Sequence, residues 1–594
     1  MIKMGSVSFS FWIWWILAIT HMLPSMIQII EARIPESPLQ CNQTLCTLYN
    51  TYGRWGDRKD CYALNASYPT TEEELRAAVS YAVKHNLKAK VVTRFSHSMP
   101  KLACPDQAVQ SSFVISTEHY NLQIQIDTSN AVVTVDAGVS LRQLIDAVEV
   151  AGFSLVVSPY WEAPKEAGIT IGGLISTGAH GSSWWGKGGS VHDHVVGLSI
   201  VVPASKSEGY AKILRLDEQN PLFNAAKVSL GVLGAISKVT LRVEPSFKRS
   251  ITYNFTSDVG LEDLYVDHAK KYEFADITWY PSQHTAIYRY DSRVPLNTSG
   301  NAVFDFIGFQ DNPTLIPEAV RASETLLERT RDAHGKCSTA AATLAYRKLT
   351  ANGLKNDGIL FTGYPVIGYQ SKMQASGSCL NSQSLHTSCP WDPRIKGLFF
   401  FETTPILPAS LFRDFVFDVK KLRDLNPQSF CGADNYNGIF LRYIKRSDAY
   451  LGQSEDSIVI DFNYYRAKDA LTPRLNQEIW EELEQMAFFK YGAKPHWGKN
   501  RNIAFLGVDK KFPNYNKFIE AKQQLDPQNV FSSNWSDEIL FGKELEKSDG
   551  CALEGLCICS EHRHCSPQNN YYCSQGLVYK DAWVCRYSTT VPPS

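Results

Sequence analysis

The chain has 594 residues, which is too long for one ordinary hydrophobic core and predicts two or three domains. Hydrophobic residues make up 44% of it and charged residues 20%, as in soluble globular proteins. With 59 basic and 60 acidic residues the formal net charge is -1, and the basic residues are scattered. This balance argues against a nucleic-acid partner or an anionic membrane surface, because both select basic patches.

The N-terminus has the layout of a secretory signal peptide covering residues 1–32. Lys3 gives a positive start, 11–19 is an apolar core, and Ala32 is a small residue at which cleavage can follow. An uncleaved membrane anchor is the competing interpretation, but the later apolar run is interrupted by His21, Pro24 and Gln28. We therefore expect a secreted protein, in the extracellular space, the cell wall or the vacuole, with no membrane span after cleavage.

Cysteines and glycosylation sequons agree with export. Six of the 14 Cys lie near the C-terminus, at Cys551, Cys557, Cys559, Cys565, Cys573 and Cys585. A short segment that is rich in Cys and poor in aliphatic residues cannot build a core without cross-links. Zinc is the competing use of 557–565, but an exported chain favours three disulfides of undetermined pairing and no metal. Five sequons predict surface glycosylation, at Asn42, Asn65, Asn254, Asn297 and Asn534.

The first part of the chain predicts a helix, a strand, a hairpin and a second helix, over 70–86, 90–95, 122–141 and 141–152. Thr71 and Glu74 have the spacing of a capping box, and Gly152 is placed to end the second helix. This order lacks the βαβ alternation of a doubly wound fold. No G-x-G-x-x-G opens a helix after a strand, so a Rossmann dinucleotide site is disfavoured.

Two polar segments follow predicted strands. The residues "RFSHS" (94–98) end the strand over 90–95, where an ordinary surface turn with a solvated histidine is the simplest interpretation. Glycines crowd 168–198, with Gly172-Gly173 after the strand-like "AGITI". Consecutive free N–H groups make an anion cradle, so this segment favours a phosphate-bearing cofactor over ordinary turn glycines. Further strands are expected over 191–203 and 230–245.

Five motifs in this order resemble one family: "RFSHS" (94–98), "IGGLISTGAHG" (171–181), "LGVLGAISKVTL" (230–241), "PHWGKN" (495–500) and "LDPQNVFSSN" (525–534). The chain from about Tyr62 to Trp535 resembles the vanillyl-alcohol-oxidase-type FAD oxidoreductases, and among them the aldonolactone oxidases of the plant L-gulonolactone oxidase type. The resemblance implies an α+β fold. It comprises an FAD-binding PCMH-type domain (62–246), an α+β substrate or cap domain (247–546) that returns to the flavin, and a separate Cys-rich disulfide module (549–587).

The resemblance also implies FAD, bonded covalently through His97 to the flavin 8α-methyl. A neutral imidazole is a suitable nucleophile for that bond. Arg94 and Ser96 stand where the family often has glycines, so Arg94 is expected to supply charge near the pyrophosphate. The remaining implied FAD contacts are Ser98, Gly138, Gly172, Gly173, Ser176, Gly178, His180, Gly181 and Ile236.

The second half is expected to shape the substrate site, with strands over 397–408, 439–445 and 457–467 and a helix over 473–492. The resemblance places Lys499 near flavin N1 and C2=O, where a fixed cation stabilises reduced flavin, and gives His496 an orienting or substrate-contacting role. Without the resemblance, packing at a helix end would explain His496 equally well.

One departure from the family concerns its Glu-x-Arg pair. Arg442 matches the arginine and is expected to bind a lactone oxygen, but Phe440 replaces the glutamate. The catalytic base is therefore open. Asp461 is a secondary candidate, or alternatively a strand residue that is satisfied by hydrogen bonds.

The implied reaction is oxidation of L-gulono-1,4-lactone by O2 to L-ascorbate and H2O2, in ascorbate biosynthesis. Two alternatives stay open: a secreted flavin-dependent carbohydrate or polyol oxidase with another substrate, and a non-catalytic secreted recognition protein on the same fold.

Overall fold

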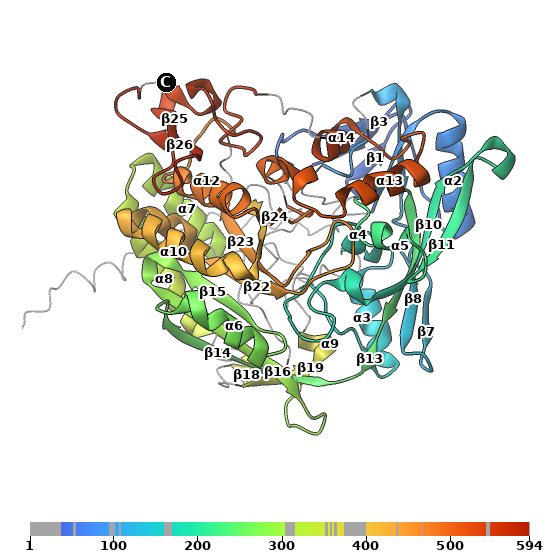
Figure 1. Cartoon of the computed structure of the whole chain (residues 1–594), viewed down its shortest axis with the longest axis horizontal. Coiled ribbons are helices and arrows are strands. Elements are labelled where there is room, and N and C mark those ends of the chain that lie inside the picture. Colours follow the sequence, from blue (N-terminus) through green and yellow to red (C-terminus); the bar gives the residue numbers. More distant parts are fainter. Residues whose placement is uncertain are drawn as a thin grey trace, which may run out of the picture.

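The computed structural model describes residues 37–50, 55–93, 101–105, 108–159, 169–302, 315–350, 355–356, 359–360, 365–373, 400–434, 438–465, 467, 469–499, 501–541 and 547–592. The predicted signal peptide (1–32) and the loop 94–98 lie outside the described residues. Among the helices that are described, none combines the length and apolar character needed to cross a membrane. The fold is α+β, as predicted (Figure 1).

The helix predicted over 70–86 is α2 (Glu72–Lys84), and its capping explains where it begins. The Thr71 hydroxyl accepts a hydrogen bond from the Glu74 N–H at 3.1 Å, as predicted. The Glu74 carboxylate instead accepts from the Thr70 N–H at 2.7 Å, so the reciprocal half of the box is shifted by one residue. The apolar face of the helix is buried, at Leu75, Val79 and Ala82.

Two sheets form the first region. The parallel one has the order β4-β6-β5 and comprises β4 (Asn65–Ser67), β6 (Ser112–Ser116) and β5 (Lys88–Val92). The antiparallel one has the order β11-β10-β12-β8-β7 and comprises β7 (Ile124–Asp127), β8 (Val132–Asp136), β10 (Val195–Pro203), β11 (Ala211–Asp217) and β12 (Ala235–Arg242). The predicted hairpin is β7–β8. Three helices and two small sheets complete this region: α3 (Leu141–Val150), α5 (Phe223–Ala226), α4 (Ile171–Ser176), β1 (Leu39–Cys41) with β2 (Cys46–Leu48) and β3 (Cys61–Ala63), and β9 (Phe153–Ser154) with β13 (Glu244–Pro245).

The strand expected just before Gly172 is not formed by residues 169–171. Ile171 begins the short helix α4, because the Thr170 hydroxyl caps it by accepting from the Gly173 N–H at 3.4 Å. The Ile171 N–H donates to Val139 O at 2.9 Å, which fixes the start of α4 beside the end of β8. The strands predicted over 191–203 and 230–245 are present as the shorter β10 and β12.

The second region is built on a large sheet with the order β19-β14-β16-β15-β22-β23-β21-β24, to which β20 adds by pairing with β23. Its strands are β14 (Lys248–Ser257), β15 (Asp276–Tyr280), β16 (Thr285–Val294), β19 (Val366–Tyr369), β20 (Phe400–Thr403), β21 (Pro405–Pro408), β22 (Ile439–Ile444), β23 (Ser457–Tyr465) and β24 (Lys494–Pro495), with a separate pair β17 (Lys355–Asn356) and β18 (Ile359–Leu360). Its helices are α6 (Leu261–Lys271), α7 (Leu315–Arg329), α8 (Ala333–Thr350), α9 (Gln370–Met373), α10 (Ala409–Leu425), α11 (Cys431–Asp434) and α12 (Gln477–Gln485). The helix predicted over 473–492 is therefore α12, followed by a π-helical turn at Met486–Lys490.

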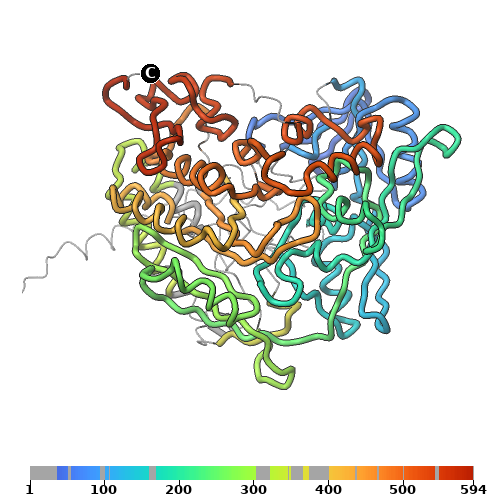
Figure 2. The backbone as a smooth tube through the Cα atoms, viewed as in Figure 1, coloured from blue at the N-terminus to red at the C-terminus, as the bar shows by residue number. Residues whose placement is uncertain are grey.

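After β24 the chain returns to the first region. Most buried apolar residues between Trp497 and Leu540 share one hydrophobic core with β8, α3, β10 and β12. The helices α13 (Tyr515–Leu525) and α14 (Asn534–Phe541) belong to this return. In Figure 2 the orange to red segment lies beside the blue and teal N-terminal part of the chain. The motif 495–499 therefore stands where the chain passes from one region to the other.

The C-terminal module contains the hairpin β25 (Tyr571–Gln575) and β26 (Trp583–Tyr587). The disulfide prediction is confirmed, with the pairs Cys551–Cys557, Cys559–Cys573 and Cys565–Cys585. All six sulfur atoms are thus used in bonds to each other, which disfavours the zinc interpretation. Three further disulfides lie in the described part of the chain: Cys41–Cys46, Cys61–Cys104 and Cys337–Cys431.

The module has a buried cluster of its own, formed by its cysteines with Ala552, Leu553 and Tyr571, and it also packs against the second region. It lies against α12 (Figure 1), and several polar side chains of that helix are buried beneath it. Its attachment combines hydrogen bonds to α12 with apolar packing, because Val578 and Tyr579 pack against the hydrophobic core of the second region. Buried polar groups need hydrogen-bond partners, and Glu481 and Glu482 of α12 find theirs in backbone N–H groups of the module.

Candidate active site

Arg442 and Asp461 meet on one face of the second sheet. The antiparallel register of β22 and β23 places Phe440 opposite Asp461, two residues from Arg442 on the same strand face. Arg442 donates from Nε at 3.0 Å and from Nη2 at 2.6 Å to Asp461 Oδ2. The second carboxylate oxygen, Oδ1, accepts from the Thr404 hydroxyl at 2.5 Å. Both oxygens of Asp461 are therefore engaged in holding neighbouring groups.

Lys499 completes a cluster of four charged side chains. Its Nζ lies 3.2 Å from Glu402 Oε2 and 4.0 Å from Asp461 Oδ1. The side chain of Lys499 is 19% exposed, whereas that of Glu402 is 4% exposed. The strands β21 and β24 pair through Pro405 and Pro495, which holds the Lys499 loop beside this sheet.

Two histidines lie next to this cluster. The rings of His180 and His496 have centroids 5.1 Å apart. His180 Nδ1 is 2.8 Å from Gly181 O and must donate to it, so Nε2 is the unprotonated nitrogen in the neutral ring. That Nε2 is buried with no hydrogen-bond partner among the described residues. His496 Nδ1 accepts from the Gly498 N–H at 3.0 Å, which leaves its proton on Nε2.

The electrostatics of the cluster keep these groups in defined protonation states. Burial, and then the positive charge of Arg442, hold the pKa of His180 well below its usual value, and burial, Lys499 and Arg442 do the same for the pKa of His496. Both imidazoles are neutral near pH 7. Burial alone would raise the pKa of Asp461, but Arg442 and Lys499 outweigh it, and the net pKa lies below the usual value.

The glycine-rich segment lies at the end of β8. Gly172 donates its N–H to Ala137 O at 2.8 Å, and a Cβ on Gly172 would approach Ala137 Cβ to 3.0 Å. Gly138 packs closely as well, since a Cβ there would lie 2.3 Å from Tyr120 O. The expected free amides are therefore not found at Gly172 and Gly173, whose N–H groups both have partners inside the protein. These glycines permit a close approach of backbones.

The other predicted cofactor contacts lie around the same helix. The Ser176 hydroxyl donates to Gly172 O at 2.7 Å, and Gly178 has a φ of +68° just after α4. A Cβ on Gly181 would lie 2.7 Å from Ser158 O. Ile236 is buried on β12, which packs against α4. The structure thus brings Gly138, the segment from Gly172 to Gly181 and Ile236 together. Arg94, Ser96, His97 and Ser98 lie outside the described residues.

Sequence reasoning missed Glu402 and Thr404. Both lie in "FFETTP" (400–405), which begins as an ordinary apolar strand and carries no motif of its own. The useful signal was alternation: Glu402 and Thr404 are two residues apart, so an extended chain directs them to one face. A buried glutamate at this period, beside a strand with Asp461, predicts a cation partner.

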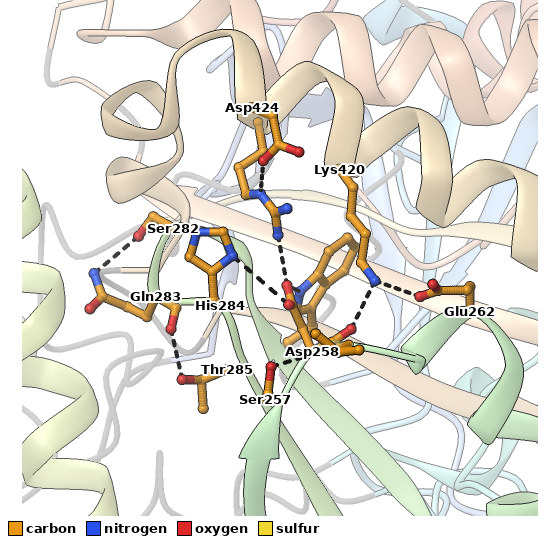
Figure 3. A network of polar contacts seen from close by, with 12 residues as sticks. Ser257, Asp258, Glu262, Ser282, Gln283, His284, Thr285, Lys420 and Asp424 are labelled. Carbon is orange, nitrogen blue, oxygen red and sulfur yellow. Dashed lines mark hydrogen bonds and ion pairs between the residues drawn. The ribbon is translucent and has the colours of Figure 1, made fainter.

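A second polar network in the same region contains the residue types of a hydrolase triad but not the geometry (Figure 3). His284 Nδ1 is 3.9 Å from Asp258 Oδ1, and the Ser282 hydroxyl donates to Asp434 and not to His284. Asp258 is instead bonded to Arg423 Nη1 at 2.7 Å and to Trp279 Nε1 at 2.9 Å. This network ties the start of α6 to α10 and supplies no activated nucleophile.

Three family models match parts of the chain: an FAD binding domain over 65–206, a D-arabinono-1,4-lactone oxidase model over 432–539, and the C-terminal domain of L-gulonolactone oxidase 2-like proteins over 548–587. All of the clustered charged residues except Glu402 fall in the second of these. The first covers β8, α4 and the glycine-rich segment.

Relatives that match nearly the whole chain are also named L-gulonolactone oxidases. The chain is 62% identical over 564 residues to L-gulonolactone oxidase 3 of Arabidopsis thaliana, which covers 94% of this chain and 95% of the relative. It is 46% identical over 575 residues to L-gulonolactone oxidase 5 of the same plant, covering 96% of each. L-gulonolactone oxidase of Bos taurus is 24% identical over 499 residues, covering 82% of this chain and 98% of the relative.

Solved structures agree on the fold. A solvent-stable cholesterol oxidase superposes with a TM-score of 0.62 at 16% identity, covering 83% of this chain and 97% of that one. Cholesterol oxidase from B. sterolicum gives a TM-score of 0.60 at 14% identity, covering 86% and 99%. At such low identity these structures speak for the fold alone. The level of identity to the plant proteins over nearly the whole length shows that the chain belongs to the L-gulonolactone oxidase family of FAD-linked oxidoreductases.

Proposed function

We propose that this protein oxidises L-gulono-1,4-lactone with O2, giving L-ascorbate and H2O2, and so acts in ascorbate biosynthesis. The observation that carries the proposal is the cluster of Arg442, Asp461, Lys499 and Glu402, within a chain that is 62% identical over 94% of its length to an L-gulonolactone oxidase. Such a cluster offers fixed donors for a neutral, oxygen-rich substrate.

The residues at the site fit FAD. When bound, FAD accepts two electrons and a proton equivalent from the carbinol and returns the electrons to O2. Two cations held by carboxylates suit a ring that gains negative charge on reduction. The unprotonated Nε2 of His180, buried without a partner among the described residues, can accept a hydrogen bond from an N–H of the bound group. The proposal includes His97 as the covalent attachment point, on the strength of the "RFSHS" motif.

Arg442 is the proposed substrate-binding residue. Asp461 holds two of its nitrogen atoms at 3.0 and 2.6 Å, which fixes the plane of the guanidinium before substrate arrives. The lowered pKa of Asp461 and the engagement of both its oxygens make it a poor proton acceptor at neutral pH. Asp461 is therefore a positioning residue for Arg442. Phe440, whose ring lies 5.3 Å from the Arg442 guanidinium carbon, contributes an apolar wall where the family has a carboxylate.

Lys499 is the proposed stabiliser of negative charge. Its ammonium is held by Glu402 at 3.2 Å and keeps partial exposure, so it can serve a ligand in the site without losing its own partner. A fixed cation of this kind needs no reorganisation when charge develops. His496, in the same loop, accepts the Gly498 N–H and so shapes the segment that carries Lys499.

Secretion and glycosylation belong to the same proposal. Six disulfides in the described residues support maturation in an oxidising compartment. All five sequon asparagines are exposed, which supports their modification: Asn42, Asn65, Asn254, Asn297 and Asn534. A shift in mass on treatment with an N-glycosidase tests the modification directly.

Anaerobic mixing tests the substrate assignment without assuming the electron acceptor. L-gulono-1,4-lactone should bleach the visible absorbance of the bound flavin, and admitted O2 should restore it with formation of H2O2. Bleaching by another polyol but by no aldonolactone would overturn the lactone assignment and favour a polyol oxidase. Precipitation with acid should leave the flavin in the wild-type pellet and release it from His97→Ala. Release from the wild type would refute the covalent bond alone.

A further inference from the structure

The C-terminal Cys-rich module covers a helix whose buried side chains are polar. Four side chains of α12 point toward it, at Gln477, Glu481, Glu482 and Gln485, and all are at most 3% exposed. Glu482 accepts from the N–H groups of Leu577, Val578 and Tyr579 at 2.7, 2.6 and 2.9 Å. Glu481 accepts from the Cys585 N–H at 2.6 Å. These contacts fix the position of the module along α12, because each carboxylate accepts hydrogen bonds from particular backbone N–H groups of the module.

The same helix also reaches strand β20, which carries Glu402 and is called the active-site strand below. Glu484 is bonded to the Thr403 hydroxyl and to Arg501, whose Nε lies 2.7 Å from Glu484 Oε1. Arg501 is 1% exposed, and its guanidinium carbon lies 4.8 Å from the ring centroid of Phe401. Phe401 and Thr403 are both on β20.

The two faces of β20 do different work. Alternation along a strand directs Phe401 and Thr403 to one face and Glu402 to the other. The first face is held by Arg501 and Glu484, and the second presents Glu402 to Lys499 at 3.2 Å. A displacement of Phe401 or Thr403 must therefore also move Glu402, the ion-pair partner of Lys499.

The module touches Arg501 directly through Gly555. A Cβ at Gly555 would lie 2.6 Å from Arg501 Cζ and Nε, and Gly555 has a φ of +67°. Gly555 O also accepts from the Ile503 N–H at 3.1 Å. Arg501 is therefore enclosed between Phe401 of the active-site strand and Gly555 of the module, two residues along the chain from Lys499.

We propose that the C-terminal module backs the active-site strand, and that Gly555, Arg501 and Glu484 are positioning residues for the Glu402–Lys499 pair. The inference rests on the proposed function, since it gives the module a role in the reaction of that site. The module has no contact with the substrate in this proposal.

Two alanine substitutions in the module provide a matched test. Gly555→Ala and Gly550→Ala place the same methyl group at positive φ, +67° and +73°, but the Gly550 methyl would meet Leu471 Cδ2 and not Arg501. In the full-length holoprotein, Gly555→Ala should speed hydrogen exchange of 400–404 and lower the flavin-bleaching rate at saturating lactone about tenfold, since small misplacements of catalytic groups are costly. The lactone KM should change less than about twofold. Gly550→Ala should leave both the exchange and the rate within about twofold of the wild type.

A second-site change separates positioning from general damage. Arg501→Lys removes the planar head that the methyl group added at position 555 would meet, so the double variant Gly555→Ala, Arg501→Lys should be less impaired than the product of the two single effects predicts. Equal behaviour of Gly555→Ala and Gly550→Ala, or faster exchange of 400–404 with an unchanged bleaching rate, would overturn the inference. Hydrogen exchange is measured without substrate, so Gly555→Ala can be compared with the wild type even if neither oxidises lactones. A wild type that is inactive on lactones, together with faster exchange of 400–404 in Gly555→Ala, would sink the lactone proposal and keep the contact between module and strand.

Discussion

Asp461 in the active site and Glu481 beneath the C-terminal module are almost equally buried, at 4% and 3% exposure, yet their pKa values move in opposite directions. For Asp461, burial is outweighed by Arg442 and Lys499, and the pKa falls below its usual value. For Glu481, burial dominates over the Cys585 N–H and the more distant charge of Arg501, and raises the pKa to about 7. At these two sites the difference lies in the neighbours: the pKa of Asp461 is lowered by Arg442 and Lys499 together, whereas burial of Glu481 is opposed chiefly by one backbone N–H.

The active site should therefore depend on its cations most strongly. Lys499→Ala should slow flavin reduction by lactone about 100-fold, the usual scale for losing one preorganised charge stabiliser. Anaerobic stopped-flow bleaching measures this rate. Lys490→Ala removes a lysine earlier in the chain that pairs with Asp418 on the surface, and should leave the rate unchanged. Equal losses in both variants would show that Lys499 acts through folding and not through charge.

Arg442→Ala tests the second cation beside Asp461. Loss of a charged hydrogen-bond donor to substrate costs about 2 kcal/mol, so the lactone concentration for half-maximal bleaching should rise about 30-fold. Arg442→Lys should recover little of this, because an ammonium cannot reproduce the fork held by Asp461. A lowered maximal rate with unchanged half-saturation would contradict the assignment of Arg442 to substrate binding.

Much of the fold was predictable from local signals. The cap at Thr71, the β7–β8 hairpin and the end of α3 near Gly152 each depend on a few neighbouring residues, and each is confirmed. The strand expected before Gly172 failed because a threonine cap, Thr170, decided for helix over the β-branched residues beside it. Local chemistry thus outweighed β propensity at that point.

The site was harder to predict where it depends on contacts between distant segments. Arg442, Asp461, His496 and Lys499 were named from motifs, and the structure brings them together. Glu402 could not be found in this way, because its meaning comes from a lysine 97 positions away. The place where the module attaches could not be predicted for the same reason: the carboxylates that accept from its backbone N–H groups lie on α12, far away in the sequence.

Glu481→Gln tests whether the buried carboxyl beneath the C-terminal module lowers stability at high pH, and it should have the smallest effect of the three variants. The folded pKa of Glu481, about 7, lies above the unfolded value of about 4.3, so the folded state holds the proton more tightly. The stability that Glu481 provides is complete below about pH 4 and is lost as the pH rises toward about 7.

The amide introduced by the substitution stays neutral and still offers an oxygen to the Cys585 N–H. At about pH 8 the variant should therefore be more stable by about 1 kcal/mol, less than the full shift implies because relaxation and entry of water reduce the cost of a buried charge. Tryptophan fluorescence at a fixed heating rate should show a higher midpoint for the variant at about pH 8 and nearly equal midpoints at about pH 4. An equal gain at both pH values would mean that packing of the amide, and not the charge of Glu481, changed the stability.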